Sequence, residues 1–195
     1  SSFSTAPLAA NLDYALNDEL ANIQTAVEAL AKLTDGGVHV GIGGANESVT
    51  PFKKLQNVTF HTFEGKHPAG NVGVQIHHVS PVQKGEIVWT VSAVMLAAIG
   101  KLFNTGKYDV RRKIAVTGPK AINPAYVEGV PGIAIKDVKE FYDASENLRY
   151  VSGDVLTGTN VGAEGFIGFF DNQITILEEG DKYELFGWAK PFRTS

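Results

Sequence analysis

The longest apolar run of the chain, IVWTVSAVMLAAIG at residues 87–100, most constrains what the chain can fold into. As a helix its 14 residues would span about 21 Å, short of the roughly 30 Å hydrocarbon core of a bilayer. β-Branched residues dominate the first half, whereas Ser92 is a good helix N-cap and Gly106 a good stop signal. We therefore predict a buried strand at 86–91 and a helix at 92–104, with no membrane span.

Composition excludes several classes of function. The 195 residues carry 17 basic and 21 acidic side chains, and the densest basic run is only Arg111–Lys113, which argues against a nucleic-acid-binding domain. Cysteine is absent, so the chain forms no disulfide, thiolate zinc site or cysteine-ligated iron–sulfur cluster. The chain starts with Ser1 and its only methionine is Met95, so we expect it to be a piece of a longer protein or a chain that lost a leader. Its first residues carry no readable targeting signal.

Helices and strands are predicted to alternate up to about residue 106, which indicates a mostly parallel sheet. An apolar stripe predicts a helix over 18–33, with Asn17 as its cap; the stripe consists of Leu20, Ile23, Val27 and Leu30. Strands are expected at 38–42 and 58–63. Segment 67–79 is ambiguous: its apolar alternation slightly favours a strand, whereas Pro68 would suit the first turn of a helix.

The second half is richer in turns and short strands. We predict a short helix over 135–142 and a hairpin turn at Asp171–Asn172. The expected strands are 113–116, 126–128, 149–152, 165–170, 173–177 and 183–188. This order is typical of a β-grasp arrangement, and it places a domain boundary near residues 107–110.

A glycine loop follows the predicted strand at 38–42. Gly41, Gly43 and Gly44 lie where dinucleotide-binding folds carry their phosphate loop, but Asn46 breaks the G-x-G-x-x-G fingerprint. Two interpretations stay open, a phosphate loop and a turn that needs glycine for its backbone geometry. The spacing favours the turn.

Histidines concentrate in one part of the chain. His61, Glu64 and His67 lie close in sequence, and the pair His77–His78 follows. Their spacings match no metal motif, and neighbouring histidines point to different faces of a helix or strand, so we expect packing or hydrogen-bonding roles and no metal site. No nucleophile motif is present either. The residues alone therefore identify no active site.

Longer blocks of sequence are more informative. FEGKHPAG at 63–70 and IHH at 76–78 resemble the A subunit of the Na⁺-translocating NADH:quinone reductase. Further similar blocks follow in the family's order: PLAA at 7–10, PV at 81–82, AIGKLF at 98–103, TGP at 117–119, NP at 123–124, VSGDVLTGT at 151–159 and ELFGWAKP at 184–191. The resemblance thus covers essentially the whole chain.

This resemblance implies an α/β plus α+β fold. Residues 1–108 would form a partial Rossmann-like doubly wound sheet lacking its first strand, and residues 109–195 a β-grasp domain of the soluble-ligand-binding type. It also makes segment 68–79 a helix rather than a strand.

The resemblance also implies a function. The chain would be a peripheral subunit on the cytoplasmic face of the bacterial inner membrane, non-catalytic by itself, contributing to a ubiquinone site and docked on the membrane-embedded subunit. FMN, FAD, iron–sulfur centres and NADH would belong to other subunits, and no catalytic residue carries over. We expect the quinone or subunit contact in segment 61–78, at His61, Glu64, Lys66, His67, Pro68, His77 and His78.

Two alternatives belong to other classes. One is a free-standing β-grasp module that binds a small soluble ligand or a glycan. The other is a flavin- or nicotinamide-dependent enzyme that uses the loop at Gly41–Gly44.

Overall fold

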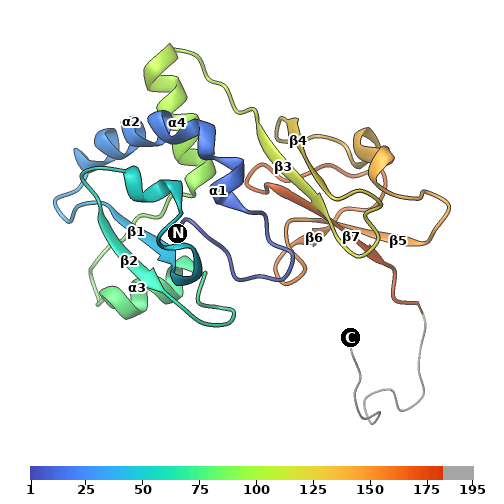
Figure 1. Cartoon of the computed structure of the whole chain (residues 1–195), viewed down its shortest axis with the longest axis horizontal. Helices are drawn as coiled ribbons and strands as arrows, with labels where there is room; N and C mark the ends of the chain where they lie inside the picture. The colour runs from blue at the N-terminus through green and yellow to red at the C-terminus, as the bar shows by residue number, and fades with distance from the viewer. Residues whose placement is uncertain (182–195) are drawn as a thin grey trace, which may run out of the picture.

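The computed structural model describes residues 1–181, in two regions that lie side by side (Figure 1). The first region holds α1 (Leu12–Ala15), α2 (Leu20–Ala31), β1 (His39–Gly43), β2 (Thr59–Phe63), α3 (Val72–Val79) and α4 (Ala93–Thr105). The second holds β3 (Arg112–Thr117), β4 (Ala125–Gly129), β5 (Leu148–Ser152), β6 (Thr159–Asn160) and β7 (Gln173–Glu178). Short 3₁₀ turns connect them: η1 (Asn17–Glu19), η2 (Gly44–Asn46), η3 (Pro51–Lys54) and η4 (Ile135–Phe141).

The first region is built on a parallel pair of strands. β1 and β2 run in register from His39 opposite Thr59 to Gly43 opposite Phe63. The predicted apolar stripe of α2 is confirmed at its centre, where Ile23 and Val27 are fully buried, and α2 packs on α4. The remaining buried side chains of this core are Ala15, Leu16, Phe52, Leu55, Ala93 and Ala97.

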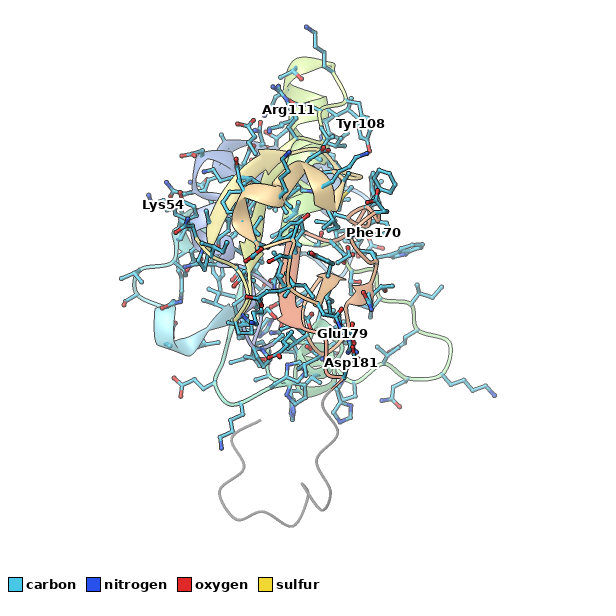
Figure 2. All side chains as sticks on the ribbon, turned by 90° about the vertical axis from the view of Figure 1, so that its right-hand side faces the viewer. Lys54, Tyr108, Arg111, Phe170, Glu179 and Asp181 are labelled. Atoms are coloured by element: carbon cyan, nitrogen blue, oxygen red, sulfur yellow. The ribbon has the colours of Figure 1, made fainter. Side chains whose placement is uncertain are left out.

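The second region is a mixed five-stranded sheet in the order β4-β3-β7-β5-β6. β3 and β7 pair in parallel, and the other pairings are antiparallel. Its core contains Ile114, Val116, Ile135, Val138, Ile174 and Ile176. Glu179 and Asp181 follow β7 and lie close together (Figure 2). Glu179 accepts hydrogen bonds from Arg149 and Asp181 accepts one from Asn147, which ties β5 and the residue before it to the end of β7.

The predicted helix at 92–104 is confirmed, but the predicted strand at 86–91 is wrong. The hydroxyl of Ser92 caps α4 by accepting from the Met95 amide, and Gly106 ends the helix in the left-handed conformation at φ 68°. Residues 77–92 are instead exposed throughout and contain no strand after α3. β-Branched content shows that a segment can form a strand, but a strand also needs a neighbour to pair with.

Two expectations in the first region need correction. The strand that alternation favours at 67–79 is wrong, since residues 72–79 form α3, as the family resemblance implies. The predicted helix at 18–33 is shorter, because η1 occupies residues 17–19 and α2 starts at Leu20. Glu19 therefore takes the N-cap position that Asn17 was expected to fill, and its side chain makes no capping bond.

Corrections in the second region concern pairing. Residues 165–170 form no strand and contribute only an isolated bridge between Ala134 and Phe166. The hairpin at Asp171–Asn172 is therefore wrong, and β7 pairs with β3 and β5 instead. The predicted helix at 135–142 is the 3₁₀ segment η4, kinked at Val138. The predicted strand at 183–188 lies outside the described residues.

None of the helices in the described part of the chain has the length and apolar character that crossing a bilayer requires.

Candidate functional site

A crevice of about 520 Å³ opens where β1 and β2 end. Its walls come from residues 2–5, the loop at 43–46 and the loop at 63–65, together with Asp13 and Thr50. Both strands point their carboxyl ends at it, the position where open parallel sheets of α/β proteins bind their ligands. The start of the chain lies beside β1 (Figure 1).

The first residues of the chain are tied to β1. The backbone amide and the hydroxyl of Ser2 both donate to the Gly41 carbonyl, at 2.9 and 3.0 Å. The ring of Phe3 lies over Gly43, where an added Cβ would come within 3.2 Å of the ring. These contacts make Phe3 an apolar wall of the crevice.

Thr5 connects the chain start to the loop after β2. Its hydroxyl accepts a hydrogen bond from the Gly70 amide at 2.9 Å and lies 3.3 Å from Nδ1 of His67. An added Cβ at Gly70 would come within 2.6 Å of the Thr5 backbone nitrogen. Glycine is therefore required at position 70 for the loop to reach Thr5.

The glycine loop does not fit a dinucleotide phosphate. A Cβ at Gly41 would fall 2.2 Å from Oε1 of Gln75, and one at Gly44 would fall 2.3 Å from Cγ of Glu64. The chain's own side chains thus cover both faces that a phosphate would approach. The loop also leads into the three-residue turn η2 and not into a helix whose N-terminus could bind an anion.

The charge of the crevice also disfavours a phosphate ligand. The charged residues that line it are Asp13, whose carboxylate accepts from the Thr50 hydroxyl at 2.6 Å, and Glu64. Among residues 1–181, lysine and arginine are missing from its lining. A phosphate would therefore meet negative charge, whereas a neutral ligand with carbonyl oxygens would meet the hydroxyls of Ser4 and Thr5.

The predicted site residues divide between several places. Glu64 lines the crevice, and His67 contacts it through Thr5. Lys66 and Pro68 are exposed on the same loop.

The other three predicted residues do not line the crevice. His61 lies on β2, and its Nε2 is 2.8 Å from Nδ1 of His39 on β1, with the two rings stacked at 5.1 Å. His77 and His78 lie exposed in the last turn of α3, with ring centroids 5.7 Å apart. Within residues 1–181, no three histidine or acidic side chains converge in a way that could hold a metal ion.

Sequence reasoning missed residues 2–5 and Asp13. The only signal for the first of these was a hydroxyl-rich start, SSFST, next to the PLAA block. Asp13 lies in α1, a helix of four residues that is too short to produce a detectable apolar period.

Comparison with known proteins identifies the family. The model described as "NqrA second alpha/beta domain" matches residues 1–108, more than half of the chain. The chain belongs to the NqrA family. A second NqrA model, described as "NQRA C-terminal domain", matches residues 113–163.

Individual proteins similar to this chain are named as A subunits of the Na(+)-translocating NADH-quinone reductase. The Na(+)-translocating NADH-quinone reductase A subunit of Serratia proteamaculans is 39% identical over 95% of the chain, and that of Rhodopirellula baltica is 38% identical over 96%. The corresponding protein of Vibrio alginolyticus is 35% identical over 96%. The chain spans about two fifths of the length of these NqrA relatives, 41–42%.

Proposed function

We propose that this chain works as part of the A subunit of a Na⁺-translocating NADH-quinone reductase. Its similarity to proteins of that name over 95% of its length supports the proposal. According to this proposal, the chain is peripheral and non-catalytic. It lies on the cytoplasmic face of the bacterial inner membrane and docks on the membrane-embedded subunit. Residues 1–108 form the Rossmann-like part and residues 109–195 the β-grasp part.

In the same proposal, the crevice at the ends of β1 and β2 contributes to the ubiquinone site. Phe3, Ile42 and Phe63 give it apolar walls, and the hydroxyls of Ser4 and Thr5 can donate to quinone carbonyls. Its volume of about 520 Å³ lies in the range of small-molecule pockets, roughly 300–1,000 Å³. The observation that carries the quinone assignment is this combination of apolar walls and hydroxyl donors, with no lysine or arginine from the described part of the chain in the lining.

The same geometry supports the assignment of the other cofactors to other subunits. Gln75 and Glu64 cover the glycine faces, and the acidic lining repels phosphate. We therefore expect FMN, FAD, iron–sulfur centres and NADH to bind elsewhere in the complex. Tight FMN binding by this chain would revive the alternative of a flavin enzyme.

Photolabelling of the assembled complex tests the quinone assignment. A photoreactive ubiquinone analogue should label peptides containing residues 2–5, 42–46 or 63–67, and excess ubiquinone should compete. Labelling of this chain only outside those peptides, for instance only at His77 and His78, would refute the crevice as the site without touching the family assignment.

A matched pair of bulky substitutions sharpens that test. Ala45 is exposed and lines the crevice, whereas Ser48 is exposed in the same loop without lining it. Ala45→Trp should raise the KM for ubiquinone about tenfold and abolish labelling, with kcat little changed. Ser48→Trp should stay within about twofold of wild type. Equal effects of both substitutions would contradict the proposal.

Co-purification tests the assignment to the complex. When the full-length protein is expressed with the membrane-embedded subunit, the two should purify together. Failure to do so would favour the alternative, a free-standing β-grasp module for a small ligand or glycan.

A further inference from the structure

A second cavity, of about 200 Å³, lies where the two regions meet. One wall comes from α4 and from the residues at and after the end of α1. Its apolar part includes Leu16, Val94 and Met95, and its charged part consists of Asp18, Glu19 and Lys101. The opposite wall comes from the start of β3, with Arg112, and from the segment before β7, with Phe169. This cavity shares no residue with the crevice at the ends of β1 and β2.

Arg112 is the unusual residue of this cavity. It is only 9% exposed, one of its Nη atoms donates to the Phe169 carbonyl, and its Nε has no hydrogen-bond partner within the described residues. Its guanidinium lies 5.9 Å from the centre of the Phe169 ring. Burial lowers the pKa of Arg112, and the charge of Asp171 opposes that change only in part. The Asp171 carboxylate accepts from the Ser152 hydroxyl at 2.6 Å, so it is already engaged.

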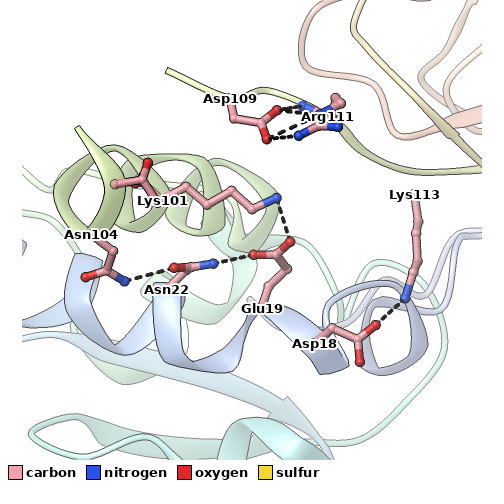
Figure 3. Close-up of polar contacts among 9 residues, drawn as sticks. Asp18, Glu19, Asn22, Lys101, Asn104, Asp109, Arg111 and Lys113 are labelled. Atoms are coloured by element: carbon pink, nitrogen blue, oxygen red, sulfur yellow. Dashed lines mark hydrogen bonds and ion pairs between the residues drawn. The ribbon is translucent and has the colours of Figure 1, made fainter. Parts of the chain in front are cut away.

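The other cations around the cavity are paired, as Figure 3 shows. Their ion pairs are Lys101 with Glu19 at 2.7 Å, Lys113 with Asp18 at 2.8 Å and Arg111 with Asp109 at 2.7 Å. Arg112 has no such carboxylate within residues 1–181. A buried guanidinium without an anion is costly, and an arriving carboxylate would remove that cost through charge-assisted hydrogen bonds.

We propose that this cavity binds a small apolar monocarboxylate, with its carboxylate on Arg112 and its hydrocarbon part against Leu16, Val94 and Met95. Size supports this class, because an apolar cavity of about 150 Å³ is enough for benzene. Charge limits it to one negative group: Asp18, Glu19 and Glu128 also line the cavity and would repel a dianion. The inference is independent of the quinone proposal, since it concerns other residues.

Benzoate is the probe that matches this description. Titrated into the 195-residue chain and followed by calorimetry or ligand-observed NMR, benzoate should bind at least about tenfold more tightly than benzamide, its neutral isostere. It should also bind more tightly than sulfate and phthalate. Equal binding of benzamide would show that the carboxylate is not recognised, and equal binding of sulfate would show a nonspecific anion site; either result overturns the proposal.

Two arginines provide the matched variants, one inside the cavity and one away from it. Arg112→Gln should weaken benzoate binding at least about tenfold. Arg149→Gln removes an exposed arginine that is paired with Glu179 and does not line the cavity, so it should change benzoate binding by less than about twofold. Equal losses in both variants would overturn the assignment.

If Arg112→Gln does not fold, Ala98→Leu gives the second test. It fills the cavity while keeping Arg112 and should also abolish benzoate binding. Unchanged benzoate binding in Ala98→Leu would place the ligand elsewhere.

Discussion

Gly100 of α4 lies so close to Asn22 of α2 that a Cβ on residue 100 would come within 1.7 Å of the Asn22 carbonyl oxygen. The two helices therefore pack with backbone against backbone at this point. We predict that Gly100→Ala lowers the free energy of unfolding by at least about 2 kcal/mol, because one helix must move away. Urea denaturation at pH 7 measures the change.

Gly73 of α3 is the control for that substitution. It has nothing within 4 Å of an added Cβ and is exposed. Gly73→Ala should therefore leave stability unchanged or raise it by roughly 0.5–1 kcal/mol, since alanine favours helix. A Gly100→Ala protein as stable as the Gly73→Ala protein would show that α2 and α4 are not in backbone contact.

The cap of α4 supports a second prediction. The Ser92 hydroxyl accepts a hydrogen bond from the Met95 amide at 3.3 Å. Ser92→Ala should cost about 1 kcal/mol of unfolding free energy, and Ser92→Asp should keep most of it, because aspartate also accepts at the N-cap. Thermal and urea unfolding of both variants measure the difference. Equal losses in the two variants would mean that this hydroxyl does not cap the helix.

Asp154 supports a prediction of pH dependence. Its Oδ1 accepts from the amides of Leu156 and Thr157 at 2.8 and 3.0 Å, and its Oδ2 from the Thr157 hydroxyl at 2.8 Å. Burial alone would raise the pKa of Asp154, but these hydrogen bonds outweigh it and lower the pKa. The carboxylate therefore stabilises the fold above its unfolded pKa of about 3.9, and this contribution is lost as pH falls through the lower folded-state pKa.

The test compares Asp154→Ala with wild type at two pH values. At pH 7 the variant should be about 1 kcal/mol less stable, a figure that allows for solvent screening at this partly exposed site. The difference should shrink as the pH is lowered below about 3.9. A difference that stayed constant down to pH 2 would rule out an ionised Asp154 as the acceptor.

Trp89 provides a spectroscopic prediction. The chain has two tryptophans, at positions 89 and 188, and the Trp89 side chain is 88% exposed. In a Trp188→Phe variant, the remaining emission should lie near that of N-acetyltryptophanamide, and acrylamide should quench it almost as efficiently. Blue-shifted and protected emission would show that segment 86–91 is buried after all.

Local signals located the two long helices, α2 and α4, although they placed the start of α2 too early. Ser92 and Gly106 marked the ends of α4, and the stripe with Ile23 and Val27 marked the buried face of α2. These features depend on contacts within a few residues of sequence, so the sequence is sufficient to locate them.

The candidate site was predictable only in part. Glu64 and His67 stood out by residue type and do lie at or next to the crevice, but Phe3 and Thr5 did not stand out. His61 contacts His39 instead. In the parallel register of β1 and β2, Gly41 lies opposite His61, and the ring of His61 lies beside that of His39, two residues before Gly41 on β1. Strand register and the path of the loops decide which of these side chains come into contact. The local spacing of residues in the sequence predicts neither of them.

Residue order was enough to locate the two long helices, the side chains that they bury and, through the long matching blocks, the family. The pairings became known only from the folded chain: β7 joins β3 and β5, segment 86–91 stays outside both sheets, and Arg112 is buried without a carboxylate partner among residues 1–181. The difference lies in the range of the interactions. Helix formation and capping are satisfied by neighbours in sequence, whereas strand pairing and charge compensation depend on residues that only folding brings together.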